Sequence, residues 1–166
     1  ALGALPVHLD WIQLLPFMSP DEKAYGCAAF YTDPHASYSP TINVKTGKRI
    51  VNELTDRKRY ADAILETGEP CIQVSYEKNL QSSPKATEAA INAGVAQVFD
   101  TLEEVAANYN VSYEALKETM DRYNGFIVAG VDEDFEKPFP EDAVPIDEGP
   151  YYVSRLWPKV HHCMGG

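Results

Sequence analysis

The 166-residue sequence is short of positive charge, because 14 Lys and Arg residues face 25 Asp and Glu residues and the net charge is −11. Nucleic acids and anionic membrane surfaces both attract basic faces, so this excess of acid argues against either as a partner. The same net charge repels carboxylate ligands, so any site for a small anion has to be built locally from Arg and His side chains.

The sequence also lacks long apolar runs and paired cysteines. No apolar stretch approaches the roughly 20 residues that a membrane-spanning helix needs, which predicts no insertion into a bilayer. Its three cysteines, Cys27, Cys71 and Cys163, are widely spaced. An odd, dispersed set of this kind predicts neither a disulfide framework nor a zinc site. We expect Cys27 and Cys71 to be buried free thiols.

Three further signals are missing: an initiating Met, a signal peptide and the Gly-x-Gly-x-x-Gly turn that binds dinucleotides. The composition, 45% hydrophobic and 23% charged, is typical of a globular domain that is large enough to bury a core. We therefore expect residues 1–166 to form a single domain that is excised from a larger protein. The compartment stays open.

Apolar patterning and turn residues predict strands, then helices, then a final strand. The strands are expected at residues 7–17, 71–76 and 150–156, with a hairpin at 41–44 and 48–51. The helices are expected from about Arg57, capped by Thr55 or Asp56, to Leu65, from the cap Ser83 to Gly94, from Thr101 to Tyr109, and onward from Ser112. Residues 19–39 should be irregular and residues 132–149 a solvated acidic connection. The fold class is α+β, with a small mixed sheet and helices.

Two segments about a hundred residues apart carry side chains suited to anions. Residues 47–57 read GKRIVNELTDR and residues 158–166 read PKVHHCMGG. Arg offers planar, bidentate contacts to carboxylates, and both Arg and His stabilise negative charge that develops during a reaction. A metal site at His161 and His162 is rejected, because adjacent strand residues point to opposite faces.

Together the two segments resemble those of the soluble fumarate reductase and urocanate reductase family, whose members are FAD-dependent and reduce the C=C bond of α,β-unsaturated carboxylates. The resemblance implies that this chain is the substrate-capping domain of such a flavoprotein. It implies that Arg57 donates a proton to the substrate and that His162 binds the substrate carboxylate. It also implies that His161, Gly165 and Gly166 lie against the flavin.

The resemblance also implies a proton relay at Thr32-Asp33-Pro34-His35-Ala36. Asp33 stands where the family has Glu. Ala36 stands where the family has Arg, so His35 becomes the substitute, and Thr32 is a candidate substrate ligand. An arginine, with a pKa above about 12, acts as an acid only if a partner returns its proton at once.

Leu15 and Phe17 depart from the family pattern, in which fumarate reducers have a substrate-binding His and a Thr around the proline. That His helps to hold the second carboxylate of fumarate. An apolar Leu15 therefore favours a substrate with a less charged far end, such as an aryl acrylate or a urocanate-like acid.

Two other functions remain open at this point. One is a free-standing acidic domain that binds a small anion near Arg57 and His162 without flavin chemistry. The other is ketosteroid dehydrogenation, which uses tyrosines as acid and base; Tyr25, Tyr31 and Tyr38 are present, but the Arg57 segment fits that reaction poorly. Under the leading hypothesis, the partners are the unsaturated carboxylate and the rest of the flavin domain in cis. The isolated chain should then neither hold FAD tightly nor turn over.

Overall fold

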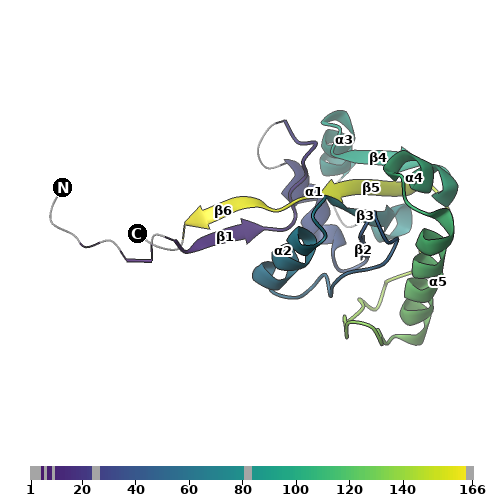
Figure 1. Cartoon of the computed structure of the whole chain (residues 1–166). Coiled ribbons are helices and arrows are strands. Elements are labelled where there is room, and N and C mark those ends of the chain that lie inside the picture. Colours follow the sequence, from purple (N-terminus) through teal and green to yellow (C-terminus); the bar gives the residue numbers. More distant parts are fainter. Residues whose placement is uncertain (1–4, 6, 9, 24–26, 81–83, 164–166) are drawn as a thin grey trace.

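The computed structural model describes residues 5, 7–8, 10–23, 27–80 and 84–163. A body of helices around a four-stranded sheet carries a projecting two-stranded ribbon (Figure 1). The helices are α1 (Cys27–His35), α2 (Arg57–Glu66), α3 (Pro84–Asn92), α4 (Leu102–Tyr109) and α5 (Tyr113–Ala129), with a 3-10 turn at Glu77–Asn79. The strands are β1 (Ile12–Leu15), β2 (Thr41–Ile42), β3 (Cys71–Tyr76), β4 (Ala96–Phe99), β5 (Tyr151–Leu156) and β6 (Lys159–Cys163). The expected α+β class is confirmed.

The sheet has the strand order β2-β3-β5-β4. Its described pairs are all antiparallel, so the expected mixed sheet was wrong in this detail. All six side chains of β3 are buried, because alternate residues of a strand face opposite sides of a sheet and both sides are covered. Ile72 and Val74 pack in one apolar cluster with Met120 of α5, whereas Cys71 packs in another with Ile64 of α2.

The helices with strong capping signals form where the sequence predicts them. Thr101 and Glu104 make a reciprocal capping box at the start of α4. The side chain of Ser112 accepts a hydrogen bond from the backbone of α5, and Gly130 ends that helix in the left-handed conformation. Leu116, Met120, Tyr123 and Ile127 form an apolar stripe on α5 that is buried in the main core.

Residues 19–39 are not irregular throughout, because they contain α1. The expectation gave Pro34 too much weight. This proline is the last residue but one of α1, so the single hydrogen bond that it removes is lost in the final turn, where the helix ends in any case. The alanines at positions 28 and 29 favour the preceding turns.

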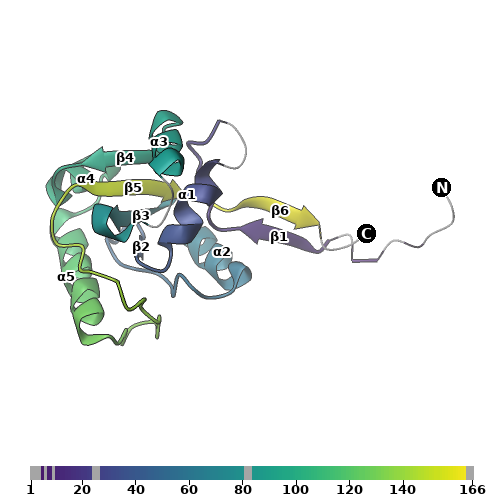
Figure 2. The same ribbon diagram turned by 180° about the vertical axis from the view of Figure 1, so that it is seen from behind.

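Two strands also differ from expectation. The predicted buried strand at 7–17 is a four-residue strand, β1, whose residues are mostly exposed or half-buried. The reason is that β1 pairs with β6 in a ribbon that projects from the body (Figure 2), where α2 covers it only in part. The sequence did not predict β4, which is short and pairs only with β5.

The connection 132–149 is only partly solvated. Asp132 and Lys137 are 3% and 2% exposed, so the expectation of solvated acids was wrong for Asp132. Both cysteines that the structure describes in full are free, with Cys71 buried and Cys27 half-buried. None of the helices in the described ranges is both long enough and apolar enough to cross a membrane.

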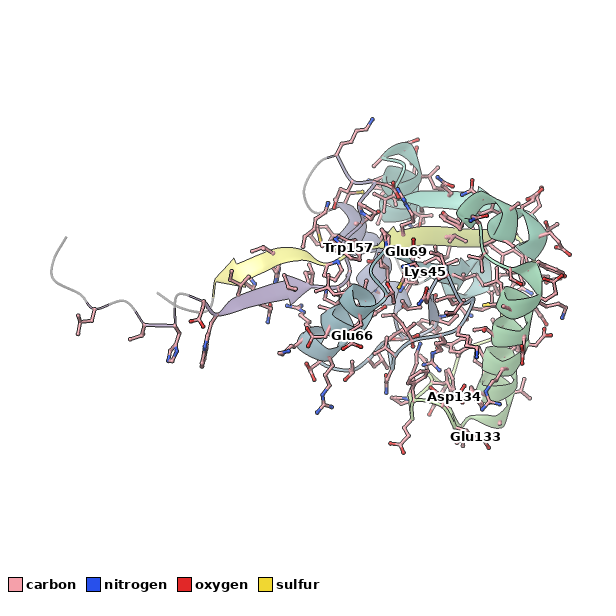
Figure 3. All side chains as sticks on the ribbon, viewed as in Figure 1. Lys45, Glu66, Glu69, Glu133, Asp134 and Trp157 are labelled. Atoms are coloured by element: carbon pink, nitrogen blue, oxygen red, sulfur yellow. The ribbon has the colours of Figure 1, made fainter. Side chains whose placement is uncertain are left out.

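The ribbon joins the body where β5 gives way to β6, and Trp157 lies at this junction (Figure 3). The backbone N–H of Trp157 donates a hydrogen bond to the carbonyl of Met18, at 2.8 Å. Met18 is itself almost completely buried, with 1% exposure. The base of the ribbon is therefore fixed to the core, and β1 lies against α2.

Candidate functional site

Arg57 is the first residue of α2 and is exposed. Asp56 caps the helix, with φ −62° and ψ 153°, and its carboxylate accepts a hydrogen bond from the backbone N–H of Arg59 at 3.0 Å. A cation in the first turn of a helix is disfavoured by the helix dipole. Such a local conflict is typical of positions where function determines the residue.

Gln13 of β1 connects Arg57 to the ribbon. Its Oε1 accepts a hydrogen bond from Arg57 Nη1 at 3.2 Å and lies 3.1 Å from His161 Nδ1. Gln13 also pairs directly with His162 across the ribbon. The two segments that the sequence singled out therefore meet at one place, and the amide of Gln13 joins them.

The rings of His161 and His162 lie on the same side of the ribbon, with centroids 3.7 Å apart. The expectation that they point to opposite faces was therefore wrong. The pairing register shifts between Gln13 and Leu14, which oppose His162 and Val160. His161 is the extra residue of a β-bulge, and such a bulge redirects the side chains around it. The described residues contain no group of three or more candidate metal ligands.

Burial lowers the pKa of His161, and the neighbouring His162 and Arg57 lower it further. An imidazole with a lowered pKa stays neutral at pH 7, so it can donate or accept a single hydrogen bond without adding charge. Arg57, in contrast, carries a permanent positive charge.

Asp33 lies on the exposed side of α1, close enough to Arg57 for the two charges to interact. Partial desolvation raises the pKa of Asp33, and the charge of Arg57 acts in the opposite direction. A carboxyl group with a raised pKa is a better proton source near neutral pH than an ordinary aspartate. The structure thus places the two side chains within electrostatic range of each other.

Thr32 and His35 lie on the buried side of the same helix, each with 0% exposure. The Thr32 hydroxyl is within hydrogen-bonding distance of two backbone carbonyls, Phe17 at 2.8 Å and Ala28 at 3.1 Å. The ring of His35 meets Tyr31 edge-on at 4.5 Å, and burial lowers the pKa of His35 to about 4. His35 is therefore neutral at pH 7.

A groove of about 710 Å³ runs between β1 and the first turns of α2. It is lined by Asp10, Trp11, Ile12, Gln13, Leu14, Asp56, Arg57, Lys58, Ala61 and Asp62. Lys58 pairs with Asp62 at 2.5 Å, which offsets its charge. Arg57 instead directs its guanidinium at the neutral amide of Gln13, so its positive charge is available to an anion.

Leu15 and Phe17, the two departures from the family pattern, are buried with 5% and 7% exposure. The Phe17 ring meets Tyr60 of α2 edge-on at 5.3 Å. Both side chains belong to the apolar cluster beneath α2. Both positions are therefore part of the hydrocarbon core and carry no polar side chain.

The ribbon carries several exposed apolar side chains. Trp11, Ile12 and Val160 are each more than half exposed, at 55%, 51% and 56%, and His161 lies among them. A flat, largely apolar ring system suits such a surface, so the described part of the ribbon fits one edge of a flavin. Gly165 and Gly166 lie outside the described residues.

The sequence pointed to most of these residues but underrated Gln13 and missed a buried set of charges. Arg49 and Glu53 form an ion pair at 2.7 Å. Asp132 pairs with the same arginine and Lys137 with the same glutamate. Only the spacing of four between Arg49 and Glu53 hinted at it. The partner at position 132 is 83 residues away from Arg49, beyond the reach of local sequence patterns.

Comparisons with known proteins agree with the resemblance seen in the sequence. Residues 40–166 match the family model described as FAD binding domain. The chain is 36% identical over 172 residues to the acrylate reductase flavoprotein subunit of Shewanella woodyi, which covers 99% of this chain and 34% of that protein. The chain thus spans about a third of the length of this relative.

Solved structures give the same answer. The open conformation of a flavocytochrome c3 fumarate reductase matches with a TM-score of 0.80 and 26% identity, over 99% of this chain and 28% of that one. A solution structure of a fumarate reductase flavoprotein subunit from Lactobacillus plantarum matches with a TM-score of 0.57 and 22% identity, a likeness of fold alone. That alignment covers 78% of this chain and 88% of the other.

Proposed function

Because this chain belongs to the FAD binding domain family, we propose that it is the substrate-capping part of a longer flavin-dependent reductase of unsaturated carboxylates. The observation that carries the proposal is the meeting of Arg57, Gln13 and His161 where α2 contacts the ribbon. The relatives named as reductases of acrylate and fumarate support it.

Reduction of a C=C bond beside a carboxylate needs a hydride at one carbon and a proton at the other. The bound, reduced flavin supplies the hydride. Arg57 donates the proton from its guanidinium, and His162 holds the substrate carboxylate. The positive charge of Arg57 also attracts the carboxylate and stabilises the negative charge that develops on it.

Asp33 is proposed to return the proton to Arg57. An unprotonated guanidine is strongly basic, so even a weak acid restores it. The raised pKa of Asp33 and its electrostatic interaction with Arg57 support this assignment. The proposed relay runs through Asp33; Thr32 and His35 are completely buried on the other side of α1, outside the groove that Arg57 lines, and are assigned no part in it.

The substrate proposed here has one carboxylate and an uncharged far end, as an aryl acrylate or a urocanate-like acid does. Leu15 and Phe17 support this choice, because both are apolar and buried where a second anionic group would need a polar partner. Burying a carboxylate without such a partner is costly. The relative named for acrylate, a monocarboxylate, is consistent with it.

The exposed face of the ribbon is proposed to pack against the rest of the flavoprotein in cis. Trp11, Ile12 and Val160 are large apolar side chains more than half exposed to solvent, and clustered exposed apolar surface marks interaction sites. His161, with Gly165 and Gly166, would face the flavin there. The described residues supply only one edge of such a site, so the isolated chain should hold FAD weakly.

The test uses the full-length flavoprotein that contains this chain, with its flavin reduced anaerobically. Acrylate, cinnamate, urocanate and fumarate are mixed with it in turn, and reoxidation of the flavin is followed. Monocarboxylates should reoxidise the flavin faster than fumarate. Failure of every unsaturated acid would overturn the proposal, whereas a preference for fumarate would overturn only the substrate assignment.

A further inference from the structure

Four charged side chains are buried together beside α5, where two of them lie over the ring of Tyr123. Their side chains are at most 4% exposed, and they pair as Arg49 with Glu53 at 2.7 Å, Arg49 with Asp132 at 2.7 Å, and Lys137 with Glu53 at 3.0 Å. We call these four residues the buried quartet. Its two cations and two carboxylates cancel, so no net charge is buried.

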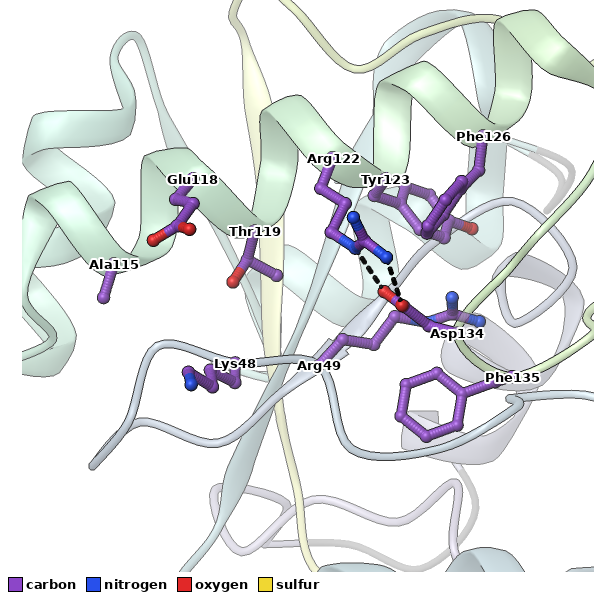
Figure 4. Close-up of a pocket in the computed structure, with 10 residues that line it drawn as sticks. All are labelled: Lys48, Arg49, Ala115, Glu118, Thr119, Arg122, Tyr123, Phe126, Asp134 and Phe135. Atoms are coloured by element: carbon purple, nitrogen blue, oxygen red, sulfur yellow. Dashed lines mark hydrogen bonds and ion pairs between the residues drawn. The ribbon is translucent and has the colours of Figure 1, made fainter.

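Arg49 is at the centre of the quartet. Its Nε and Nη2 donate to the two oxygens of Glu53, at 2.9 and 2.7 Å, and its Nη1 donates to Asp132. The guanidinium also lies 4.9 and 5.0 Å from the ring centroids of Tyr123 and Phe135 (Figure 4). Charge pairing and ring stacking together fix the guanidinium in one orientation.

The carboxylate of Glu53 connects the guanidinium of Arg49 to the backbone of β2. It accepts a hydrogen bond from the backbone N–H of Thr41 at 2.8 Å. The hydroxyl of the same Thr41 is hydrogen-bonded to the hydroxyl of Tyr60, which has 0% exposure. Arg57 lies between positions 53 and 60, so the chain is tied to β2 on both sides of it.

Asn52 makes a second connection between the quartet and α2. Its Nδ2 donates to the carbonyl of Phe135 at 3.1 Å, and its Oδ1 accepts from the backbone N–H of Leu54 at 2.9 Å. Asp132 holds the other side of this contact, because its carboxylate accepts backbone N–H bonds from Asp134, Phe135 and Lys137. The turn at 132–137 and the turn at 52–55 are thus one unit.

We propose that Asp132 and Lys137 are positioning residues for Arg57, which act through Arg49, Glu53 and the backbone that leads into α2. This inference rests on the proposed function, because it assigns the quartet to the proton-transfer step. Neither residue touches the site itself: both lie beside α5, while Arg57 lies beside the ribbon.

The chemistry of the quartet favours a positioning role over one in stability alone. Well-packed apolar residues of similar size are often as stabilising as a buried ion network, or more so. What charges add is a single geometry, since each donor must find its acceptor. Proton transfer demands such precision, because a displacement of about 1 Å costs roughly a hundredfold in rate.

The test compares Asp132→Asn with Asp134→Asn in the reduced, full-length flavoprotein, with sodium acrylate as the oxidising substrate. Asp134 is the matched control: it lies two residues away, in an exposed bidentate pair with Arg122. Single-turnover reoxidation of the flavin gives the rate, and its dependence on acrylate concentration gives the affinity. Circular dichroism establishes that each variant is folded.

We expect Asp132→Asn to slow reoxidation at saturating acrylate at least tenfold, an order-of-magnitude figure, while the affinity changes little. Asp134→Asn should stay within about twofold of the wild type, because exposed ion pairs contribute little. A folded Asp132→Asn enzyme with the wild-type rate would overturn the inference. A slowed rate that comes only from weakened acrylate binding would overturn it as well.

Two further variants keep the outcome decisive. If Asp132→Asn fails to fold, Asn52→Ala interrupts the second connection at a half-buried position, and we expect it to slow the rate with unchanged affinity. A normal rate there would contradict the inference. Arg57→Ala distinguishes a failure of the proposed function from a failure of this inference. If that variant also turns over normally, the proposed function fails, and not merely the role of the quartet.

Discussion

His35 should make the stability of this chain fall as the pH drops below 6.5. Its side chain is completely buried, and burial lowers its pKa to about 4 from the ordinary 6.5. Between these values the unfolded chain binds a proton that the folded chain excludes. The stability is therefore fully present above pH 6.5 and is lost progressively as the pH falls toward 4.

The size of the effect follows from the two pKa values. Each unit of difference corresponds to about 1.4 kcal/mol, so the contribution of His35 between pH 7.5 and 4.5 is about 2.5 kcal/mol. Other groups contribute to the pH dependence as well, including Asp33, whose pKa is raised by partial burial. The quantity to test is therefore a difference between variants, not the slope of the wild type.

Urea unfolding of the wild-type chain, His35→Gln and Tyr31→Phe at pH 7.5 and 4.5 measures this difference. His35→Gln should lose about 2.5 kcal/mol less than the wild type on acidification, whatever its stability at pH 7.5. Tyr31→Phe keeps the ring that packs edge-on against His35 and should lose as much as the wild type. Equal losses in the wild type and His35→Gln would refute the reasoning.

The remaining predictions concern the hairpin turn at Gly47, the core, the flavin and the substrate. Gly47→Ala should lower the free energy of unfolding by at least about 1 kcal/mol in urea unfolding, because Gly47 has φ +68° and a Cβ there would lie 2.7 Å from the Cβ of Ala115. Leu156→Ala should cost about 2–5 kcal/mol in the same assay, since Leu156 has 0% exposure. The isolated chain, purified from cells, should show no stoichiometric flavin absorbance, and bound yellow flavin would contradict that. In the full-length enzyme, Leu15→His should raise kcat/KM for fumarate relative to acrylate on the order of tenfold, and an unchanged ratio would contradict the substrate assignment.

Local signals account for the elements that the sequence predicted well. The capping box of Thr101 and Glu104 and the cap at Ser112 are satisfied within one helical turn, so they act wherever the helix lies. The hairpin around Gly47 is reduced to a short β2 and a single bridge from Ile42 to Arg49, yet its turn is where the sequence put it. These features depend on neighbours in the chain alone.

Elements that depend on distant partners could not be predicted. Strand β4 has four residues and exists because β5 offers it an edge. Asp132 is buried because Arg49, 83 residues earlier, meets it there. From sequence alone, an acidic stretch that contains proline predicts a solvent-exposed segment. No local pattern distinguishes a carboxylate that has found a cation from one that faces water.

The candidate site shows the same division. The resemblance in sequence named Arg57 and His162 and predicted that they act together, and the contacts of Gln13 with Arg57 and with β6 do bring their segments together. That Gln13 joins Arg57 to His161, and that a bulge turns both histidines to one side, depends on strand register. Register is set by the ribbon as a whole, so the geometry became clear only in the structure.

The claim at the centre of this account is that Arg57 gives the proton to the substrate. The direct measurement is anaerobic single-turnover reoxidation of the reduced full-length flavoprotein by acrylate, for Arg57→Ala and for Arg59→Ala. Arg59 is the matched control, an exposed arginine in the same turn whose partner is Asp56 at 3.3 Å.

We predict that Arg57→Ala slows reoxidation about 10²- to 10⁴-fold, the usual contribution of a general acid. Arg59→Ala should stay within about twofold of the wild type. An Arg57→Ala enzyme that is folded, holds its flavin and reoxidises at the rate of Arg59→Ala would contradict the assignment of Arg57 as the proton donor.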